Sequence, residues 1–371
     1  MGGGGLVSDY LAEEAGAEPF YRGSYRSASH FRDKAAEVEA DFDRARRERF
    51  PGLIRPVSEQ AEEKLQRVRA EEGFVVTTGQ QPGLFGGPLY SLYKALTAVR
   101  LAEVLEETLS RPVMQLFWIA SDDHDWEEAN HTWLIDSNND LRELSLGPRA
   151  DALEASLARS LLGPGVGAAI EGLRDCLPGS DFSADWLDRV GHAYRPENTV
   201  ASAFTELMEA LLGDTALGFV DAADPALKEA ATPVLEREIV SAAEGEALLA
   251  ERTRLLEQAG YSGQVTLMEG GLNLFWENGA GRQRLFRDGE AFRYGRGGES
   301  IERQELLSRL RDDARDFSPN VLLRPVVESF LFPTLSYVGG PGEMAYFGQL
   351  GPFFRHHDVG PPIVTPRASF L

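Results

Sequence analysis

The sequence predicts an α/β fold whose core is a parallel sheet, with helical and small β insertions. One observation is an apolar strand, a Gly-rich turn and a helix over residues 74–109, followed by a second buried strand at 113–120. Strand, helix and strand within about 45 residues form a βαβ unit, which implies parallel pairing. The other is that polar residues follow three predicted strands directly, as they do at the ligand-binding edge of such sheets.

The composition is that of a soluble globular protein with one large or two modest domains. The 371 residues carry a net charge of −22, which argues against binding to nucleic acid or to an anionic membrane. Cys176 is the only cysteine in the sequence, so an internal disulfide and a cysteine-based metal cluster are both excluded. The N-terminus lacks the basic and apolar regions of a signal peptide, and we expect a cytoplasmic location.

The N-terminal part is predicted to be helical. Residues 28–48 and 58–72 have the pattern of charged amphipathic helices, and Pro51 and Pro56 separate them. This segment leads into the first core strand, at 74–78.

The helix between the two core strands is expected over 88–109. One side of it carries the apolar residues Leu89, Leu92, Tyr93, Leu96, Val99 and Leu105. Arg111-Pro112 ends the helix, and the almost wholly apolar run 113–120 predicts a buried strand.

Further elements follow in order along the chain. A hairpin is expected at 131–147, an α-rich insertion at 151–213, a strand at 217–224 and one long amphipathic helix at 226–258. Short alternating runs, including GQVTLME, then predict antiparallel strands over 260–296, with Asn-Gly at 278–279 and Asp-Gly at 288–289 as turns.

The last part of the chain is expected to return to the core. A surface helix is predicted at 301–312, a strand and a helix on either side of a Gly-Pro-Gly turn within 317–354, and a final strand at 361–367. These elements suggest six segments: an N-terminal helical segment (1–72), the first half of the core (73–150), an α-helical insertion (151–213), a core strand and helix (214–259), a small β-rich insertion (260–300) and the second half of the core (301–371).

The Gly-rich stretch after the first strand is predicted to be a ligand-binding corner. Glycines allow close backbone approach, and the free N–H groups of a helix start suit an anion. The spacing GQQPGLFGG matches neither standard phosphate motif, and Lys94 lies too far on to be a Walker lysine. The alternative is a structural Gly-rich connection. The candidate binding residues are Thr78, Gly79, Gln80, Gln81, Gly83, Gly87 and Tyr90.

The second core strand ends in three carboxylates and an imidazole, at Asp122, Asp123, His124 and Asp125. Such a cluster can bind a divalent cation or place a carboxylate–His pair for proton transfer. The alternative is helix N-capping by Asp122 or Asp123. Asn130 lies close enough along the chain to reach the same crevice.

A third polar group follows the strand near residue 338. Gly340 and Gly342 form a turn that places Glu343 in the first turn of a helix, where a backbone nest can hold an anion. A purely structural turn is the alternative. Arg324 is flanked by apolar residues, and an arginine in that setting usually pairs with a carboxylate, either of the protein or of a ligand. We expect all three polar groups to converge on one crevice.

Three long motifs together resemble the bacillithiol-biosynthesis cysteine-adding enzymes, the BshC family. They are TTGQQPGLFGGPLYSLYKA, FWIASDDHDWEEANH and RPVVESFLFPTLSYVGGPGEMAYFGQL, and the resemblance runs from about residue 20 to the C-terminus. It implies a Rossmann-like core similar to class I nucleotidyl-transferases and synthetases. The Thr78–Gly83 turn would replace their nucleotide-binding signature, whose HxGH-type histidines are absent here.

The resemblance also implies an activity, a cytoplasmic ligase that joins the carboxyl group of cysteine to the amine of glucosaminyl malate. Such a carboxyl must be activated, so ATP or ADP with Mg²⁺ is expected. His124 or Asp125 is the expected base, with Asp123 beside them, and Arg324 the expected receiver of the malate carboxylates. Family members continue into a dimerising coiled coil that these 371 residues do not contain.

Two other functions remain open from the residues alone. A metal held by the Asp/His cluster would make the protein an amide hydrolase, in which a metal-bound water attacks the amide. A core that has lost its chemistry would bind a sugar acid or a nucleotide without turnover.

Overall fold

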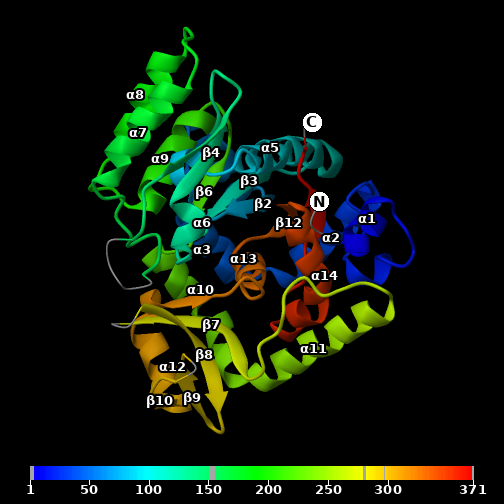
Figure 1. The fold of residues 1–371 in the computed structure, drawn as a ribbon. Coiled ribbons are helices and arrows are strands. Elements are labelled where there is room, and N and C mark those ends of the chain that lie inside the picture. The colour runs from blue at the N-terminus through cyan, green and yellow to red at the C-terminus, as the bar shows by residue number, and fades with distance from the viewer. Residues whose placement is uncertain (1–3, 150–154, 279–280, 296, 370–371) are drawn as a thin grey trace.

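A six-stranded sheet runs through the centre of the molecule (Figure 1). The computed structural model describes residues 4–149, 155–278, 281–295 and 297–369. Across the sheet the strands follow the order β1 (Arg55–Pro56), β6 (Gly218–Asp221), β3 (Val113–Ile119), β2 (Phe74–Gln80), β12 (Thr334–Gly339) and β13 (Ile363–Pro366). β1 pairs antiparallel with β6, and the other neighbours pair in parallel.

The strand order is that of a doubly wound α/β fold. From β2 the chain moves outward through β3 to β6, and it then returns to the other side of β2 to form β12 and β13. The winding direction therefore reverses between β2 and β12, and ligands bind outside the carboxyl ends of the strands at such a reversal. The predicted fold class is confirmed.

β2 and β3 occupy the middle of the sheet because both faces of each strand are apolar. All seven residues of β3 are buried, and so are the first six of β2. The strands pair in register from Phe74 opposite Val113 to Gln80 opposite Ile119. The two predicted strands and their parallel pairing are confirmed.

Helix α5 (Tyr90–Leu109) connects β2 to β3, and the predicted apolar side is only partly buried: Leu92 and Val99 pack against the core and Leu105 is buried. Leu89 is 62% exposed and Leu96 is 45% exposed. The buried residues of α5 are Ser91, Lys94, Ala95, Ala98, Ala102 and Leu105. Small side chains let this face of the helix approach the sheet closely, and Leu92 and Val99 pack at its edge.

The predicted helix at 28–48 is two helices, α2 (Ala28–Asp41) and α3 (Arg44–Arg49). The chain breaks there because the Asp43 carboxylate accepts a hydrogen bond from the Arg46 N–H at 3.0 Å and caps a new helix. The other N-terminal elements are α1 (Gly4–Leu11), α4 (Glu59–Ala70), and the 3₁₀ turns η1 (Glu18–Phe20) and η2 (Phe50–Leu53).

An α-rich segment lies between β3 and β6, with a hairpin at its start, as predicted. Its elements are α6 (Trp126–Ala129), β4 (His131–Ile135), β5 (Leu141–Ser145), α7 (Gly165–Cys176), α8 (Ser183–Ala193) and α9 (Val200–Leu212). The expected start of the insertion at residue 151 lies outside the described residues.

The single helix predicted over 226–258 is also two helices, α10 (Pro225–Val240) and α11 (Ala242–Gln258). Ser241 separates them with a non-helical backbone, φ −118° and ψ 30°. Its hydroxyl donates to the Arg237 carbonyl at 2.7 Å, a local bond that competes with the helical pattern.

A second, antiparallel sheet packs below the first in the view of Figure 1. Its strands are, in order, β10 (Ser300–Glu302), β9 (Ala291–Tyr294), β8 (Gly281–Asp288), β7 (Gly271–Asn278) and β11 (Phe317–Pro319). The antiparallel strands expected here are confirmed, but the run 263–269 is not a strand, because its N–H groups at Gln264 and Val265 donate to the Gln349 side chain. The Asn-Gly turn predicted at 278–279 lies partly outside the described residues.

Four elements complete the chain: α12 (Arg303–Asp312), the 3₁₀ turn η4 (Ala314–Asp316), α13 (Arg324–Leu331) and α14 (Pro341–His356). None of the described helices combines the length and the apolar character needed to cross a membrane.

A buried ion pair connects the two sheets. The Lys228 amine of α10 lies 3.0 Å from the Asp122 carboxylate, just after β3, and donates to the Phe317 carbonyl of β11 at 2.7 Å. Both side chains are largely buried, at 4% and 12% exposed. Asp122 therefore fixes the second sheet against the end of β3.

We predict that Lys228→Met lowers the free energy of unfolding by roughly 3 kcal/mol, because it leaves the Asp122 charge buried without a partner. Urea denaturation followed by circular dichroism measures the change. Arg254→Met is the matched control, since it breaks an exposed ion pair with Glu251 and should leave the midpoint nearly unchanged. Equal midpoints for Lys228→Met and the control would contradict a stabilising role for the buried pair.

Candidate active site

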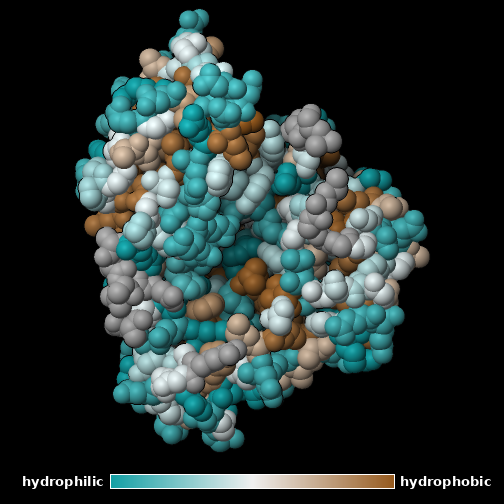
Figure 2. Space-filling model, in the orientation of Figure 1, coloured by the Kyte–Doolittle hydropathy of each residue, from teal (hydrophilic) through white to brown (hydrophobic). Residues whose placement is uncertain are grey.

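A cleft of about 370 Å³ opens at the carboxyl ends of β2 and β12, where the winding of the sheet reverses. Figure 2 shows a hollow with a hydrophilic floor near the centre of this face. All three polar groups predicted from the sequence contribute to it. Its lining residues are Gly79, Gln80, Gln81, Tyr90, Lys94, Trp118, Ala120, Asp123, Val321, Arg324, Gly340, Pro341, Gly342, Glu343, Tyr346 and Arg367.

The last residues of β2 and Gln81, which follows it, divide into structural and cleft-lining positions. Thr78 is fully buried and donates to the Val338 carbonyl at 2.8 Å, so it ties β2 to β12 and does not line the cleft. Gly79 lines the cleft and must be glycine, because a Cβ there would lie 2.7 Å from the Trp118 carbonyl oxygen. Gln80 and Gln81 also line the cleft.

The rest of the Gly-rich turn points away from the cleft. The Tyr194 hydroxyl donates to the Gly83 carbonyl at 3.0 Å and accepts from the Gly86 N–H at 2.9 Å. Gly87 has a φ of +68°, which glycine adopts readily. Gly83 and Gly87 therefore shape a turn, η3 (Leu84–Gly86), that is anchored on the helical insertion, and neither lines the cleft.

A buried lysine that the sequence analysis set aside lies at the centre of the site. The Lys94 amine contacts the Glu343 carboxylate at 2.5 Å and donates to the Gly79 carbonyl and the Gln80 Oε1 atom at 2.9 Å each. Burial lowers the pKa of Lys94. Burial opposes ionisation of Glu343 too, but the Lys94 charge outweighs it and holds the Glu343 pKa below its usual range.

The nest predicted at the start of α14 is partly filled by the protein itself. The Glu343 carboxylate accepts from the Gly340 N–H at 2.8 Å and from the Tyr337 hydroxyl. Gly342 lines the cleft, and a Cβ there would meet nothing within 4 Å. The first-turn N–H groups of a helix have no acceptor within it, so this end of α14 keeps donors for a ligand.

Arg324 pairs with a carboxylate of the protein, which is one of the two partners that its apolar setting predicted. Its guanidinium lies 3.1 Å from the Glu328 carboxylate and 2.9 Å from the Tyr346 hydroxyl. Burial raises the pKa of Glu328 to about 7, although Arg324 and a hydrogen bond from Thr77 oppose that rise.

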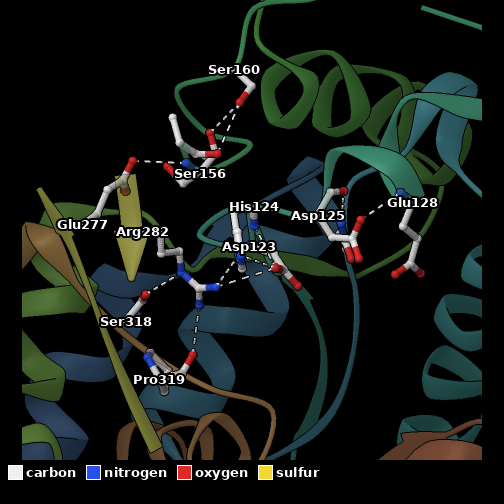
Figure 3. Close-up of polar contacts among 12 residues, drawn as sticks. Asp123, His124, Asp125, Glu128, Ser156, Ser160, Glu277, Arg282, Ser318 and Pro319 are labelled. Atoms are coloured by element: carbon white, nitrogen blue, oxygen red, sulfur yellow. Dashed lines mark hydrogen bonds and ion pairs between the residues drawn. The ribbon is translucent and has the colours of Figure 1, made fainter. Parts of the chain in front are cut away.

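The consecutive acidic residues after β3 diverge. Asp122 faces Lys228, and Asp123 lines the cleft. Asp125 caps α6 by accepting from the Glu128 N–H at 3.0 Å (Figure 3). The capping alternative therefore describes Asp125, not Asp122 or Asp123. In the described part of the chain, no three His, Cys, Asp or Glu side chains come together as a metal site.

His124 and Asn130 lie beside the cleft without lining it. Asn130 is buried and contacts the Gly147 carbonyl at 3.4 Å and the His131 ring at 3.1 Å. The His124 ring is held by Arg282 of β8, whose guanidinium lies 2.9 Å from the His124 Nδ1 atom.

Arg282 is the second important residue that the sequence analysis missed. Its side chain is only 5% exposed and donates to the Ser318 hydroxyl at 2.8 Å and to the Pro319 carbonyl at 3.3 Å (Figure 3). A guanidinium only donates, so the His124 Nδ1 atom accepts and the proton of the neutral ring lies on Nε2. Arg282 therefore fixes His124 as a donor through Nε2.

Arg282 also lies near the carboxylate of Asp123, which lines the cleft. The Arg282 guanidinium lies 3.7 Å from the Asp123 carboxylate, which also accepts from the His124 N–H at 2.7 Å. Burial opposes ionisation of Asp123, but the His124 side chain, the Arg282 charge and the His124 N–H together outweigh it and hold the Asp123 pKa below its usual range. Asp123 is thus a fixed negative charge on one wall of the cleft.

Arg367 supplies a positive charge on the other wall. Its guanidinium lies 5.3 Å from the centre of the Tyr90 ring and donates to the Ala368 carbonyl at 3.0 Å. It also lies close to Gly340, so it faces the start of α14. This arrangement can hold an anion between Arg367 and the helix N-terminus, and an amine beside Asp123.

We predict that Arg282→Met releases the His124 tautomer. In the wild-type protein, the imidazole ¹⁵N shifts should show the proton on Nε2, and in the variant Nδ1–H should appear, because Nδ1 then faces the Asp123 carboxylate at 3.4 Å. Long-range ¹H–¹⁵N correlation spectra provide the measurement, with His192 as the unaffected internal reference. A wild-type ring already protonated on Nδ1 would contradict the assignment.

We also predict a pH effect from Glu328. Its raised pKa means that the folded state keeps a proton that the unfolded state releases above its ordinary pKa of 4.5. The stabilising contribution is complete below pH 4.5 and is lost as the pH rises through about 7. Relative to Glu328→Gln, the wild-type free energy of unfolding should fall by on the order of 3 kcal/mol across this window. Urea titrations of both proteins at several pH values test this, and a constant difference would contradict it.

Comparison with known proteins identifies the family. Residues 4–368 match the family model described as "Bacillithiol biosynthesis BshC, N-terminal Rossmann-like domain". The chain is 34% identical to a protein of Salinibacter ruber over 98% of its length, and 34% identical to one of Solibacter usitatus over 98%. It is 32% identical to one of Chlorobium phaeobacteroides over 99%.

Each of these relatives carries the name "Putative cysteine ligase BshC", and the chain spans 67%, 67% and 66% of their respective lengths. The matched region includes all three motifs that line the cleft. The chain therefore belongs to the BshC family of bacillithiol biosynthesis.

Proposed function

We propose that the cleft is the active site of a cysteine ligase, which joins the carboxyl group of cysteine to the amine of glucosaminyl malate. Membership of the BshC family and the names of the relatives support the ligase activity. The observation that carries the assignment to this cleft is the pairing of opposite charges across it, Asp123 on one wall and Arg367 on the other.

These charges match the acceptor substrate. Glucosaminyl malate has an amine and two carboxylates, so it needs a negative group at one end and donors at the other. Arg367 and the N-terminus of α14 are the donors that remain for the malate end, because Arg324 is already engaged with Glu328 and Tyr346. Arg324 then orients the Tyr346 hydroxyl, which lines the same wall.

Asp123 is the residue we assign to the amine. The amine must lose a proton as its nitrogen bonds to the cysteine carbonyl carbon, and Asp123 is an ionised carboxylate that lines the cleft. Asp125 is used as a helix cap, and His124 offers only its Nε2–H. Both former candidates for the base are therefore positioning residues in this proposal.

ATP with Mg²⁺ is proposed as the source of activation, because a free carboxylate and an amine do not condense in water. When bound, ATP would supply a leaving group on the cysteine carboxyl. The side-chain amides of Gln80 and Gln81 also line the cleft and can donate to phosphate oxygens, which leaves Asp123, Arg367 and the start of α14 for glucosaminyl malate.

The test is product formation by the purified chain with cysteine, glucosaminyl malate, ATP and Mg²⁺, followed by mass spectrometry. Asp123→Asn should lower kcat by about 100-fold or more, and Arg367→Gln should mainly raise KM for glucosaminyl malate, by about tenfold. Glu251→Gln, on the exposed face of α11, is the matched control.

Two results would overturn parts of this proposal. Unchanged turnover in Asp123→Asn would remove the assigned base, and product formed without ATP would remove the nucleotide. Saturable binding of glucosaminyl malate without turnover under any condition would favour the alternative of a non-catalytic binding core.

A further inference from the structure

A second pocket, of about 200 Å³, lies at the other end of α14 from the cleft. Three cationic side chains and a group of apolar ones line it, including Arg22, Arg252, Arg355, Phe20, Pro361 and Pro362. They come from three parts of the chain that are distant in sequence: the segment around η1, helix α11, and α14 with the loop after it.

Two of the arginines face the same empty space. Arg252 and Arg355 each place a terminal nitrogen near Gly351, at 3.7 Å and 4.0 Å from the point where a Cβ on Gly351 would lie. Like charges brought together repel each other, and burial together with the Arg355 charge lowers the pKa of Arg252.

The protein leaves this charge uncompensated. Arg22 is paired with Glu37 at 2.7 Å. Arg252 donates to the carbonyl oxygens of Gly348 at 3.0 Å and Pro19 at 2.8 Å, which fix its position without neutralising it. Within the described part of the chain, no ion pair forms between a carboxylate and either Arg252 or Arg355. A half-buried arginine, Arg252, beside an exposed one, Arg355, with spare N–H donors is a suitable receptor for an oxyanion.

We propose that this pocket binds a small organic anion, a phosphate or carboxylate group attached to a flat apolar group. The guanidinium groups of Arg252 and Arg355 would bind the oxyanion in two-point contacts. The Phe20 ring, which already stacks with Arg252 at 4.5 Å, and the two prolines would hold the apolar part. The proposal does not rest on the ligase reaction, because the cleft lies at the opposite end of α14.

The experiment is calorimetric titration of the full chain with phenyl phosphate, benzoate and inorganic phosphate. We expect saturable binding of phenyl phosphate or benzoate, and the stronger of the two identifies the oxyanion. Inorganic phosphate should bind more weakly than phenyl phosphate, because it cannot use the apolar wall. Equal affinity of these two phosphates would overturn the proposed apolar part, and no saturable binding of any probe would overturn the site.

Two variants locate the binding. Arg355→Gln should weaken it by about tenfold, since it removes one charged donor. Gly351→Glu should abolish it by placing a carboxylate between the two guanidinium groups, and its thermal stability shows that the protein still folds. Arg254→Gln is the matched control, because it removes an equal charge from an exposed site on α11. Binding that survives both pocket variants but is lost in Arg367→Gln would place the anion in the cleft and overturn the inference.

Discussion

The buried ion pair between Lys94 and Glu343 is the interaction on which the geometry of the cleft depends. It lies where the winding of the sheet reverses, and it joins α5, α14 and the end of β2. The amine has three acceptors within 2.9 Å, so the cost of removing it from water is offset by a full set of contacts. Because Glu343 also caps its own helix through Gly340, the same pair fixes the start of α14.

The ion pair also determines which charges remain for a ligand. Lys94 pairs with Glu343, and Arg324 contacts Glu328, Tyr337 and Tyr346, so these groups form a closed polar network. Arg367 and Asp123 stay at the cleft surface as its positive and negative poles. A chain with a net charge of −22 thus has both a cationic and an anionic side chain at this cleft, as the proposed acceptor substrate requires.

The sequence predicted the core and the place of the cleft because both follow from local patterns. Apolar runs give β2 and β3, and the polar residues that follow parallel strands must meet at one edge. The roles within the motifs were not predictable in this way. Asp122, Asp123 and Asp125 are alike in sequence, but Asp125 caps the adjacent helix α6, while the roles of Asp122 and Asp123 are decided by the distant partners Lys228 and Arg282.

Lys94 and Arg282, which were not predicted as site residues, differ in how far the local sequence indicates their roles. Lys94 lies one helical turn after Tyr90, among small residues of α5, and a charge on such a face indicates a buried partner. Arg282 lies in an ordinary run of a β hairpin, and nothing near it in sequence relates it to the motif at His124. Its role arises only because β11 and β7 bring the second sheet against the end of β3.

The second sheet is therefore part of the site and not an accessory to the core. Arg282 holds the His124 ring and favours the charge of Asp123, while Lys228 holds the edge of the same sheet to Asp122. Asp122, which fixes the position of the second sheet, and Asp123, which lines the cleft, are thus adjacent residues of one motif. The Lys228–Asp122 and Arg282–Asp123 contacts end on two consecutive residues of the chain. A movement of the second sheet therefore changes the environment of Asp123.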